Sequence, residues 1–555
     1  MKKRLLSLLL AALMLCGALS GCGAIDALSP LLDDPSSSEP ATGSGSTLDT
    51  LTQERYFTDC WRADTDFADM YAEADLDYFR SLGDELLSVA SGSPDSDSFD
   101  DAAFYFIDEY YYICTAHDLA NLRYYRDPSD QEALAAMNQA YADRGEADGI
   151  FWDIMHQVAL TDSYDLLADY CGESQAQVFS AYDPDASSDS SLRNRETELV
   201  NKYYSLSASP EPDFDACADV FVELVNVRRE IAAAAGNDSY ADYAYYQTYS
   251  RNYTPEDSRS VWAAVKDYFV PIRTELKAML QDNYAKLMES GIEVSSQDAL
   301  DALGTVAHGL SPEAAKAYDY LVEHGLCDNE LLSTKAGVNF TSTLYWYNEP
   351  YIFLTPDGSY YDYSGIIHEF GHFLNSYAVP SDLIFGAADY EICEMQSIGM
   401  EFMATHWYEE LFGPDTARML LLDSFFNSII NVMDGAMFDE FLQRVYAEED
   451  LTKERVCEIY AELYKEYGND VYDGYDKEWI SVPHNFDSPF YYISYCMATI
   501  PVLGLYSELQ TSPEATPTCA WCPWTRRYIT APRSFPSSAS PIHSTPPPTP
   551  PPPTP

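Results

Sequence analysis

Apolar residues spaced by three and four positions recur through the middle of the chain. This spacing puts apolar side chains on one face of an α-helix, where they pack against a core. The stretches with this pattern are residues 214–235, 261–288 and 419–445. Proline and glycine signal breaks in the pattern at residues 208–212, 304–312 and 412–415. Apolar residues make up 46% of the chain, and the body between its two ends is long enough to form a large core. The sequence therefore predicts a mainly helical fold.

One short region instead favours β-structure. Residues 342–347 and 351–354 are rich in β-branched and aromatic side chains, and Asn-Glu-Pro separates them. Such runs on either side of a short turn indicate a hairpin. We expect it to lead through the Pro-Asp-Gly turn at 356–358 into the next helix. Residues 351–354 are expected to form an edge strand on which an extended peptide could pair.

That next helix, predicted over residues 363–377, carries His-Glu-Phe-Gly-His. His368 and His372 stand at positions i and i+4, so their imidazoles project from the same face, as two ligands of one zinc ion must. Glu369 lies between them, placed to take a proton from zinc-bound water without being a ligand. Five-residue patterns also arise by chance, but this one sits on an amphipathic helix in a chain with only nine histidines. The motif predicts one catalytic Zn²⁺ per chain.

A catalytic zinc needs a third protein ligand and an open position. The extended HExxHxxGxxH pattern would require glycine at 375 and histidine at 378, but these positions hold Asn375 and Ala378. The next helical stretch offers Glu391, Glu394 and Glu401, which share one helix face. Any of the three could complete the site, unless it belongs to a solvated face. The residues alone leave this choice open.

The N-terminus predicts export. Basic residues precede an apolar run that is too short to span a membrane, and the run ends in Leu-Ser-Gly-Cys22. This end resembles a bacterial lipoprotein cleavage box, so we expect residues 1–22 to be a signal peptide and Cys22 to carry a diacylglycerol. The alternative is ordinary cleavage with Cys22 incidental. Residues 23–50, rich in Ser, Gly and Pro, suit a flexible tether. The expected location is the extracytoplasmic face of a bacterial cell membrane.

Residues 511–555 differ sharply from the rest of the chain. No acidic residue follows Glu514, and 13 of the 32 prolines lie after it. This tail is either a disordered, polyproline II extension or the product of a shifted reading frame. We divide the remaining chain into an N-terminal helical region, 51–210, and a catalytic region, 211–510. With 90 acidic and 31 basic residues, the net charge is −59, which argues against nucleic acid as a partner.

The zinc motif and its downstream glutamates carry a family resemblance. Glu394 lies 22 positions after His372, and Ser397 and Glu401 follow at +3 and +7. This pattern resembles the oligoendopeptidase F branch of the thimet-oligopeptidase (M3) family. The resemblance implies that Glu394 is the third zinc ligand, that Glu401 supports the site from outside the ligand set, and that Glu391 is a second choice. The likeness covers residues 215–510 and is faint before them.

The same resemblance implies late catalytic residues. The family places a histidine and tyrosines near its C-terminus, where they stabilise the tetrahedral intermediate. Here His484 is followed by Tyr491, Tyr492 and Tyr495. The alignment favours Tyr492 and Tyr495 with His484, while Tyr491 competes with Tyr492.

Together these features predict a zinc endopeptidase with Glu369 as general base, and the family resemblance implies short, unfolded oligopeptides as its substrates. The resemblance further implies a gluzincin-type helical fold with a cleft between helical halves. Three alternatives remain: an exported lipoprotein that binds peptides without cutting them, a relative that keeps the motif but lacks turnover, and a different exported zinc peptidase family that shares HExxH and a downstream glutamate. The oligomeric state stays open.

Overall fold

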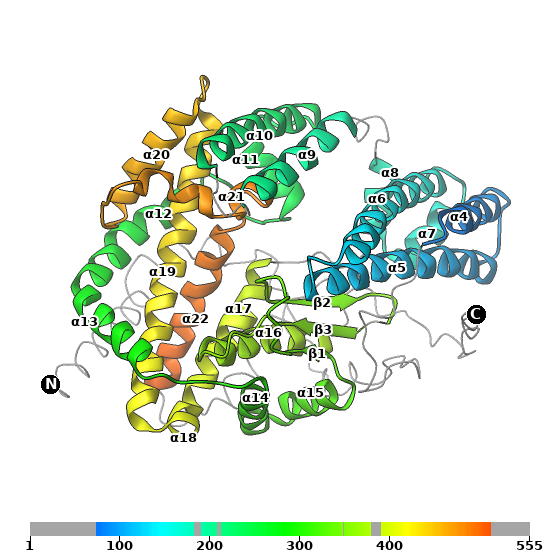
Figure 1. Ribbon diagram of the computed structural model, residues 1–555. Coiled ribbons are helices and arrows are strands. Elements are labelled where there is room, and N and C mark those ends of the chain that lie inside the picture. Colours follow the sequence, from blue (N-terminus) through cyan, green and yellow to red (C-terminus); the bar gives the residue numbers. More distant parts are fainter. Residues whose placement is uncertain (1–73, 183–189, 208–212, 348, 379–389, 512–555) are drawn as a thin grey trace.

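The computed structural model describes residues 74–182, 190–207, 213–347, 349–378 and 390–511 (Figure 1). The expected signal peptide, the tether and nearly all of the tail lie outside these residues. So does the break expected at 208–212. The described residues are mostly helical, with one small sheet, and this confirms the predicted fold class. None of the described helices combines the length and the apolar character that crossing a membrane requires.

The first helices form an N-terminal lobe, seen in blue and cyan in Figure 1. They are α4 (Leu76–Ser91), α5 (Ser96–Arg126), α6 (Gln131–Ala159), α7 (Tyr164–Cys171) and α8 (Glu173–Ala181). Aspartates accept hydrogen bonds from the free N–H groups at the starts of α4, α5 and α6. The lobe has its own core, in which Phe79, Phe106, Tyr110 and Phe151 stack.

A second group of elements surrounds the main core. They are α9 (Ser190–Ser207), α10 (Phe214–Ala234), α11 (Tyr240–Tyr243), the π-helix η2 (Ala244–Thr248), α12 (Ser258–Ala264), the π-helix η3 (Val265–Phe269), α13 (Val270–Glu289), α14 (Ser296–Leu310) and α15 (Pro312–Glu323). The stretch expected at 261–288 is helical throughout, but a π-turn precedes Pro271, which has no N–H to donate.

The break expected at 304–312 lies at the end of that range, where α14 ends at Leu310 and α15 begins at Pro312. Helix α14 continues through Gly304 and ends at Leu310. A Cβ at Gly304 would lie 2.7 Å from the ring of Tyr318 on α15. This glycine therefore permits close helix packing and does not interrupt the helix.

The sheet has three strands, β1 (Cys327–Asp328), β2 (Phe340–Leu344) and β3 (Glu349–Phe353), in the order β1-β3-β2. Strands β2 and β3 form the expected antiparallel hairpin, with Ser342 opposite Tyr351. The short parallel strand β1 was not predicted, and it changes the role of β3. Because β3 lies between two strands and all five of its residues are buried, the expectation of an edge strand there is wrong. The outer strand of the hairpin is β2.

The last elements build the centre of the molecule. They are α16 (Tyr361–Ala378), α17 (Tyr390–Ala404), the 3₁₀-helix η4 (Thr405–Trp407), α18 (Tyr408–Phe412), α19 (Pro414–Ala447), α20 (Lys453–Glu466), the 3₁₀-helix η5 (Tyr475–Ser481), α21 (His484–Asp487) and α22 (Ile493–Thr511). Helix α17 packs between α16 and α22, and α22 packs along α19 (Figure 1).

Helix α5 joins the lobe to the sheet. The backbone N–H of Ala336 donates to the carbonyl of Tyr125 at 2.8 Å, and the N–H of Trp346 donates to Thr115 Oγ1 at 2.9 Å. The C-terminal half of α5 therefore serves the catalytic region, while its N-terminal half packs in the lobe core.

Candidate metal centre

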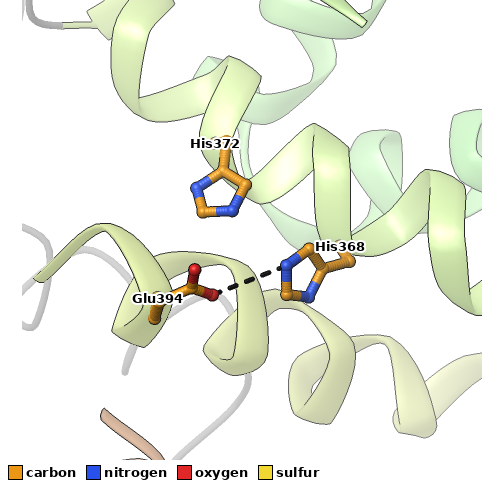
Figure 2. Close-up of side chains that lie close together, drawn as sticks. All are labelled: His368, His372 and Glu394. Carbon is orange, nitrogen blue, oxygen red and sulfur yellow. Dashed lines mark ion pairs between the residues drawn. The ribbon is translucent and has the colours of Figure 1, made fainter. Parts of the chain in front are cut away.

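Helices α16 and α17 bring three ligand-type side chains together. His368 and His372 project from one face of α16, and Glu394 of α17 faces them (Figure 2). Each offers a ligand atom, and these atoms lie within 4.8 Å of one another. The helices approach closely because residue 371 is glycine: a Cβ there would lie 2.6 Å from Ser397 Cα. The Gly within the motif thus sets the distance between the ligand-bearing helices.

The chemistry of these donors fits zinc. Two imidazole nitrogens and one carboxylate oxygen form a three-residue set typical of catalytic zinc, which leaves a fourth position for water or substrate. The Glu394 side chain is buried, and burial raises its pKa, while His368 and two hydroxyl donors oppose this shift. One of these donors is Ser397, whose Oγ lies 3.3 Å from Glu394 Oε2. A buried carboxylate of this kind is stabilised by a neighbouring cation.

His368 is oriented by a second carboxylate. Its Nδ1 lies 2.7 Å from Glu401 Oε1, and its Nε2 lies 3.6 Å from Glu394 Oε2 (Figure 2). A metal bound at Nε2 would leave the ring proton on Nδ1, from which His368 donates to Glu401, as metal-ligating histidines do. Burial opposes protonation of His368, but Glu401 outweighs it and raises its pKa to about 9. Burial and His368 lower the pKa of His372 to about 3, so this imidazole is in the neutral form that a metal ligand requires.

Glu369 lies beside this group and is only 5% exposed. Its Oε2 accepts a hydrogen bond of 2.7 Å from Thr341 Oγ1 on strand β2. Burial raises the pKa of Glu369, and this shift suits a proton acceptor that works near neutral pH. Nothing in the sequence pattern singled out Thr341, because its contact with Glu369 depends on how the sheet packs on α16.

The C-terminal tyrosines divide into two groups. Tyr491 donates to Glu394 Oε1 at 2.7 Å, and Tyr495 contacts Tyr491 edge to face at 5.3 Å between ring centroids. Burial raises the pKa of Tyr495, and Glu394 is the next largest cause. Tyr492 instead packs its ring on Phe438 of α19 at 5.1 Å. Tyr491 thus bonds Glu394, whereas Tyr492 packs against α19 and also contacts Tyr495 edge to face at 5.5 Å.

His484 lies close to the same tyrosines. Its ring centroid is 5.5 Å from that of Tyr491 and 5.0 Å from that of Tyr492. Burial lowers the pKa of His484 and so favours its neutral form. As a neutral imidazole, His484 can donate a hydrogen bond from one ring nitrogen.

Glu391, the second choice for the third ligand, is engaged elsewhere. Its Oε1 accepts from Arg251 Nε at 2.8 Å and from Tyr253 Oη at 2.7 Å. Burial opposes ionisation of Glu391, but Arg251 outweighs it and lowers its pKa. The structure therefore groups Glu394, and not Glu391, with the two histidines.

A His-Glu-x-x-His helix packed against a glutamate-bearing helix is an arrangement that zinc peptidases use. Residues 312–515 match the family model described as peptidase family M3. The resemblance to M3 peptidases that the motifs indicated is thereby confirmed for this region.

Solved structures share the fold. A putative oligoendopeptidase F and PZ peptidase A with an inhibitor each align with a TM-score of 0.69 and 18% identity, over 84% of this chain and 95% of theirs. A putative oligoendopeptidase F from Bacillus anthracis aligns with a TM-score of 0.65 and 17% identity, over 84% of this chain and 94% of that one. No curated protein sequence matches the chain.

Proposed function

We propose that the protein is a zinc-dependent endopeptidase that hydrolyses short, unfolded peptides. The observation that carries this proposal is the convergence of His368, His372 and Glu394 within 4.8 Å, with the buried Glu369 beside them. The peptidase family match and the names of the structural neighbours, two of them oligoendopeptidases, support peptides as substrates.

His368, His372 and Glu394 would hold the zinc ion. When bound, Zn²⁺ would lower the pKa of water toward neutrality and polarise the scissile carbonyl. Glu401 keeps His368 in the tautomer that presents Nε2, and Tyr491 and Ser397 fix the Glu394 carboxylate by hydrogen bonds.

Glu369 would act as the general base. Its carboxylate accepts a proton as water attacks the carbonyl carbon, and it returns that proton to the nitrogen of the leaving amine. Thr341 holds the carboxylate oxygen Oε2 in place during both transfers. Burial of Glu369 keeps competing bulk water away from the transferred proton.

Donors on the opposite side would stabilise the developing oxyanion. Because the Tyr491 hydroxyl is already bonded to Glu394, the neighbouring Tyr495 is the preferred tyrosine candidate. His484 is the imidazole candidate. Tyr492 stays a prediction whose place against Phe438 makes it the weaker candidate.

We further propose that the enzyme works at the extracytoplasmic membrane surface, anchored by lipid on Cys22. The support is the signal-peptide and lipoprotein pattern of residues 1–22. Membrane fractionation of bacteria that express the native chain and Cys22→Ser tests this. Release of the variant, but not of the native protein, from the membrane is the expected result, and equal partition would refute the anchor.

The direct test of the peptidase proposal is hydrolysis of a quenched fluorescent peptide by the chain without its signal peptide. We expect cleavage that a zinc chelator abolishes and that added Zn²⁺ restores. A folded protein that holds zinc and yet cleaves nothing in a diverse peptide library would instead favour a peptide-binding or catalytically degenerate role.

A further inference from the structure

We propose that Arg251 is a positioning residue that fixes the metal-ligand helix α17 and the turn carrying Tyr491 in one arrangement. The inference rests on the proposed zinc function and adds a residue 140 positions before Glu391 in the sequence. Arg251 lies just after η2 and touches none of the three proposed zinc ligands among the contacts of the described residues.

The guanidinium of Arg251 bonds to two elements at once. Its Nε donates to Glu391 Oε1 at 2.8 Å, and its Nη2 donates to the carbonyl of Phe490 and to Ser494 Oγ, both at 2.9 Å. The side chain is fully buried. The rings of Tyr245 and Tyr249 each lie 4.5 Å from its Cζ atom. A planar guanidinium stacked on aromatic rings donates hydrogen bonds in fixed directions, which a lysine ammonium cannot do.

Glu391 and Phe490, two of the partners of Arg251, are each connected through the chain to the Glu394 carboxylate. Glu391 lies one helical turn before Glu394 on α17. Phe490 immediately precedes Tyr491, whose hydroxyl donates to Glu394 Oε1. Arg251 is therefore connected to Glu394 in two ways. One connection is its bond to Glu391 on α17, and the other is its bond to the Phe490 carbonyl next to Tyr491. Movement at either connection would change how Glu394 faces the two histidines.

The backbone turn before Tyr491 is strained and needs hydrogen bonds from its surroundings. Phe490 has a φ of +71°, in the left-handed region that residues other than glycine rarely adopt. This conformation is strained and persists only where surrounding contacts enforce it. Arg251 bonds the Phe490 carbonyl, and Tyr249 Oη donates to the Pro489 carbonyl at 3.0 Å. Residues of one loop thus enforce the strained turn from which Tyr491 reaches Glu394.

Arg228 provides a matched control. It is also buried, bonds a carboxylate through Nε (Glu196, 2.6 Å) and bonds the carbonyl of Phe486 through Nη2. Its carboxylate partner lies on α9, which bears no proposed metal ligand. The two arginines therefore share their chemistry but differ in what they position.

The test measures zinc affinity by competition with a chromogenic chelator, in the native chain, Arg251→Lys and Arg228→Lys. Supporting contacts around metal ligands are typically worth 10- to 100-fold in metal affinity. We expect that loss for Arg251→Lys and native affinity for Arg228→Lys, although both lose stability. Native zinc affinity in a folded Arg251→Lys, or equal losses in both variants, would overturn the inference.

A milder pair decides the matter if Arg251→Lys does not fold. Tyr253 Oη donates to Glu391 at 2.7 Å, and Tyr245 Oη donates to Asp439 of α19 at 2.6 Å. Both tyrosines are buried, and each substitution by phenylalanine removes one hydroxyl. We expect Tyr253→Phe to weaken zinc binding several-fold and Tyr245→Phe to leave it unchanged. Equal zinc affinities in the two variants would contradict the proposed arrangement.

Zinc affinity also separates this inference from the proposed function. A native chain that binds zinc but cleaves no peptide removes the peptidase proposal, while the comparison of Arg251→Lys with Arg228→Lys still decides the role of Arg251. A native chain that binds no zinc removes both. Loss of zinc affinity confined to Arg251→Lys and Tyr253→Phe, measured without any peptide present, is the result expected here.

Discussion

The N-terminal lobe and the catalytic region differ most in what they bury. In the lobe core, Phe79 and Phe106 stack at 4.7 Å and Tyr110 and Phe151 at 4.3 Å. Among described residues, the lobe's buried polar side chains are Thr115, Asp143 and Ser163. The rest of the chain buries many charged side chains: Arg228, Arg251, Asp328, Lys335, Glu349, Glu369, Glu394, Asp423, Asp439 and Glu440.

The two regions therefore differ in the interactions that hold their elements together. An apolar core gains stability from volume and area alone. A buried charge costs several kcal/mol in desolvation, and even a well-paired buried ion pair is often no more stabilising than apolar packing. We infer that the buried charges of the catalytic region fix the arrangement of its elements, as the Arg251–Glu391 pair does where it joins α17 to the residues after η2.

The largest effect is expected from loss of a metal ligand. His372→Ala removes one of three donors, so we expect zinc content to fall from about one ion per chain to near zero, with peptidase activity lost alongside it. His156→Ala is the control in the lobe, where His156 Nδ1 lies 2.9 Å from the Phe179 carbonyl. Metal analysis of both purified variants makes the comparison. Full zinc occupancy in His372→Ala would contradict the assignment.

A large effect on stability alone is expected from the lobe core. Phe106 is fully buried, and Phe106→Ala should lower the free energy of unfolding by about 3–5 kcal/mol, because it leaves a cavity. Urea unfolding followed by circular dichroism measures this change. Zinc affinity of the folded variant should equal that of the native chain. A loss of zinc affinity would show that the two regions are more closely coupled than their cores indicate.

An intermediate effect should separate the adjacent tyrosines. Tyr491→Phe removes the hydrogen bond to Glu394, so we expect zinc affinity to fall about 10- to 100-fold. Tyr492→Phe should change it little, because that ring packs on Phe438. Chelator competition on both variants provides the measurement. The reverse order of effects would restore Tyr492 as the tyrosine at the metal group.

The smallest effect concerns pH and the lobe. Burial, and then the charges of Asp108 and Asp75, raise the pKa of Glu109 from 4.5 to about 7. Because this folded-state pKa lies above the unfolded value, stability falls as pH rises from about 4.5 to about 7. Glu109→Gln should therefore raise the free energy of unfolding by about 1 kcal/mol at pH 8, a value that allows for solvent screening, and change nothing at pH 4. Equal effects at both pH values would refute this assignment.

Local spacing made part of the site predictable. The i, i+4 histidines require only helical geometry, and α16 spans Tyr361–Ala378 around them, close to the expected 363–377. The family pattern pointed to Glu394 and Glu401, and the structure places both against His368. These residues lie on two elements whose helical period can be recognised in the sequence.

Long-range contacts were not predictable from the sequence. Thr341 reaches Glu369 only because β2 packs on α16, and the two-residue strand β1 is too short to give a pattern. Arg251 reaches Glu391 across 140 positions. The choice between Tyr491 and Tyr492 depends on the left-handed turn at Phe490, which no local preference of phenylalanine indicates.

The central claim is that Glu369 performs proton transfer at a zinc site formed by α16 and α17. The most direct measurement is peptide hydrolysis by Glu369→Gln beside the native chain, at equal zinc content. We expect kcat to fall about 10²- to 10⁴-fold, because the amide keeps the shape of the carboxylate but cannot accept the proton. Native kcat in a zinc-loaded Glu369→Gln would contradict it.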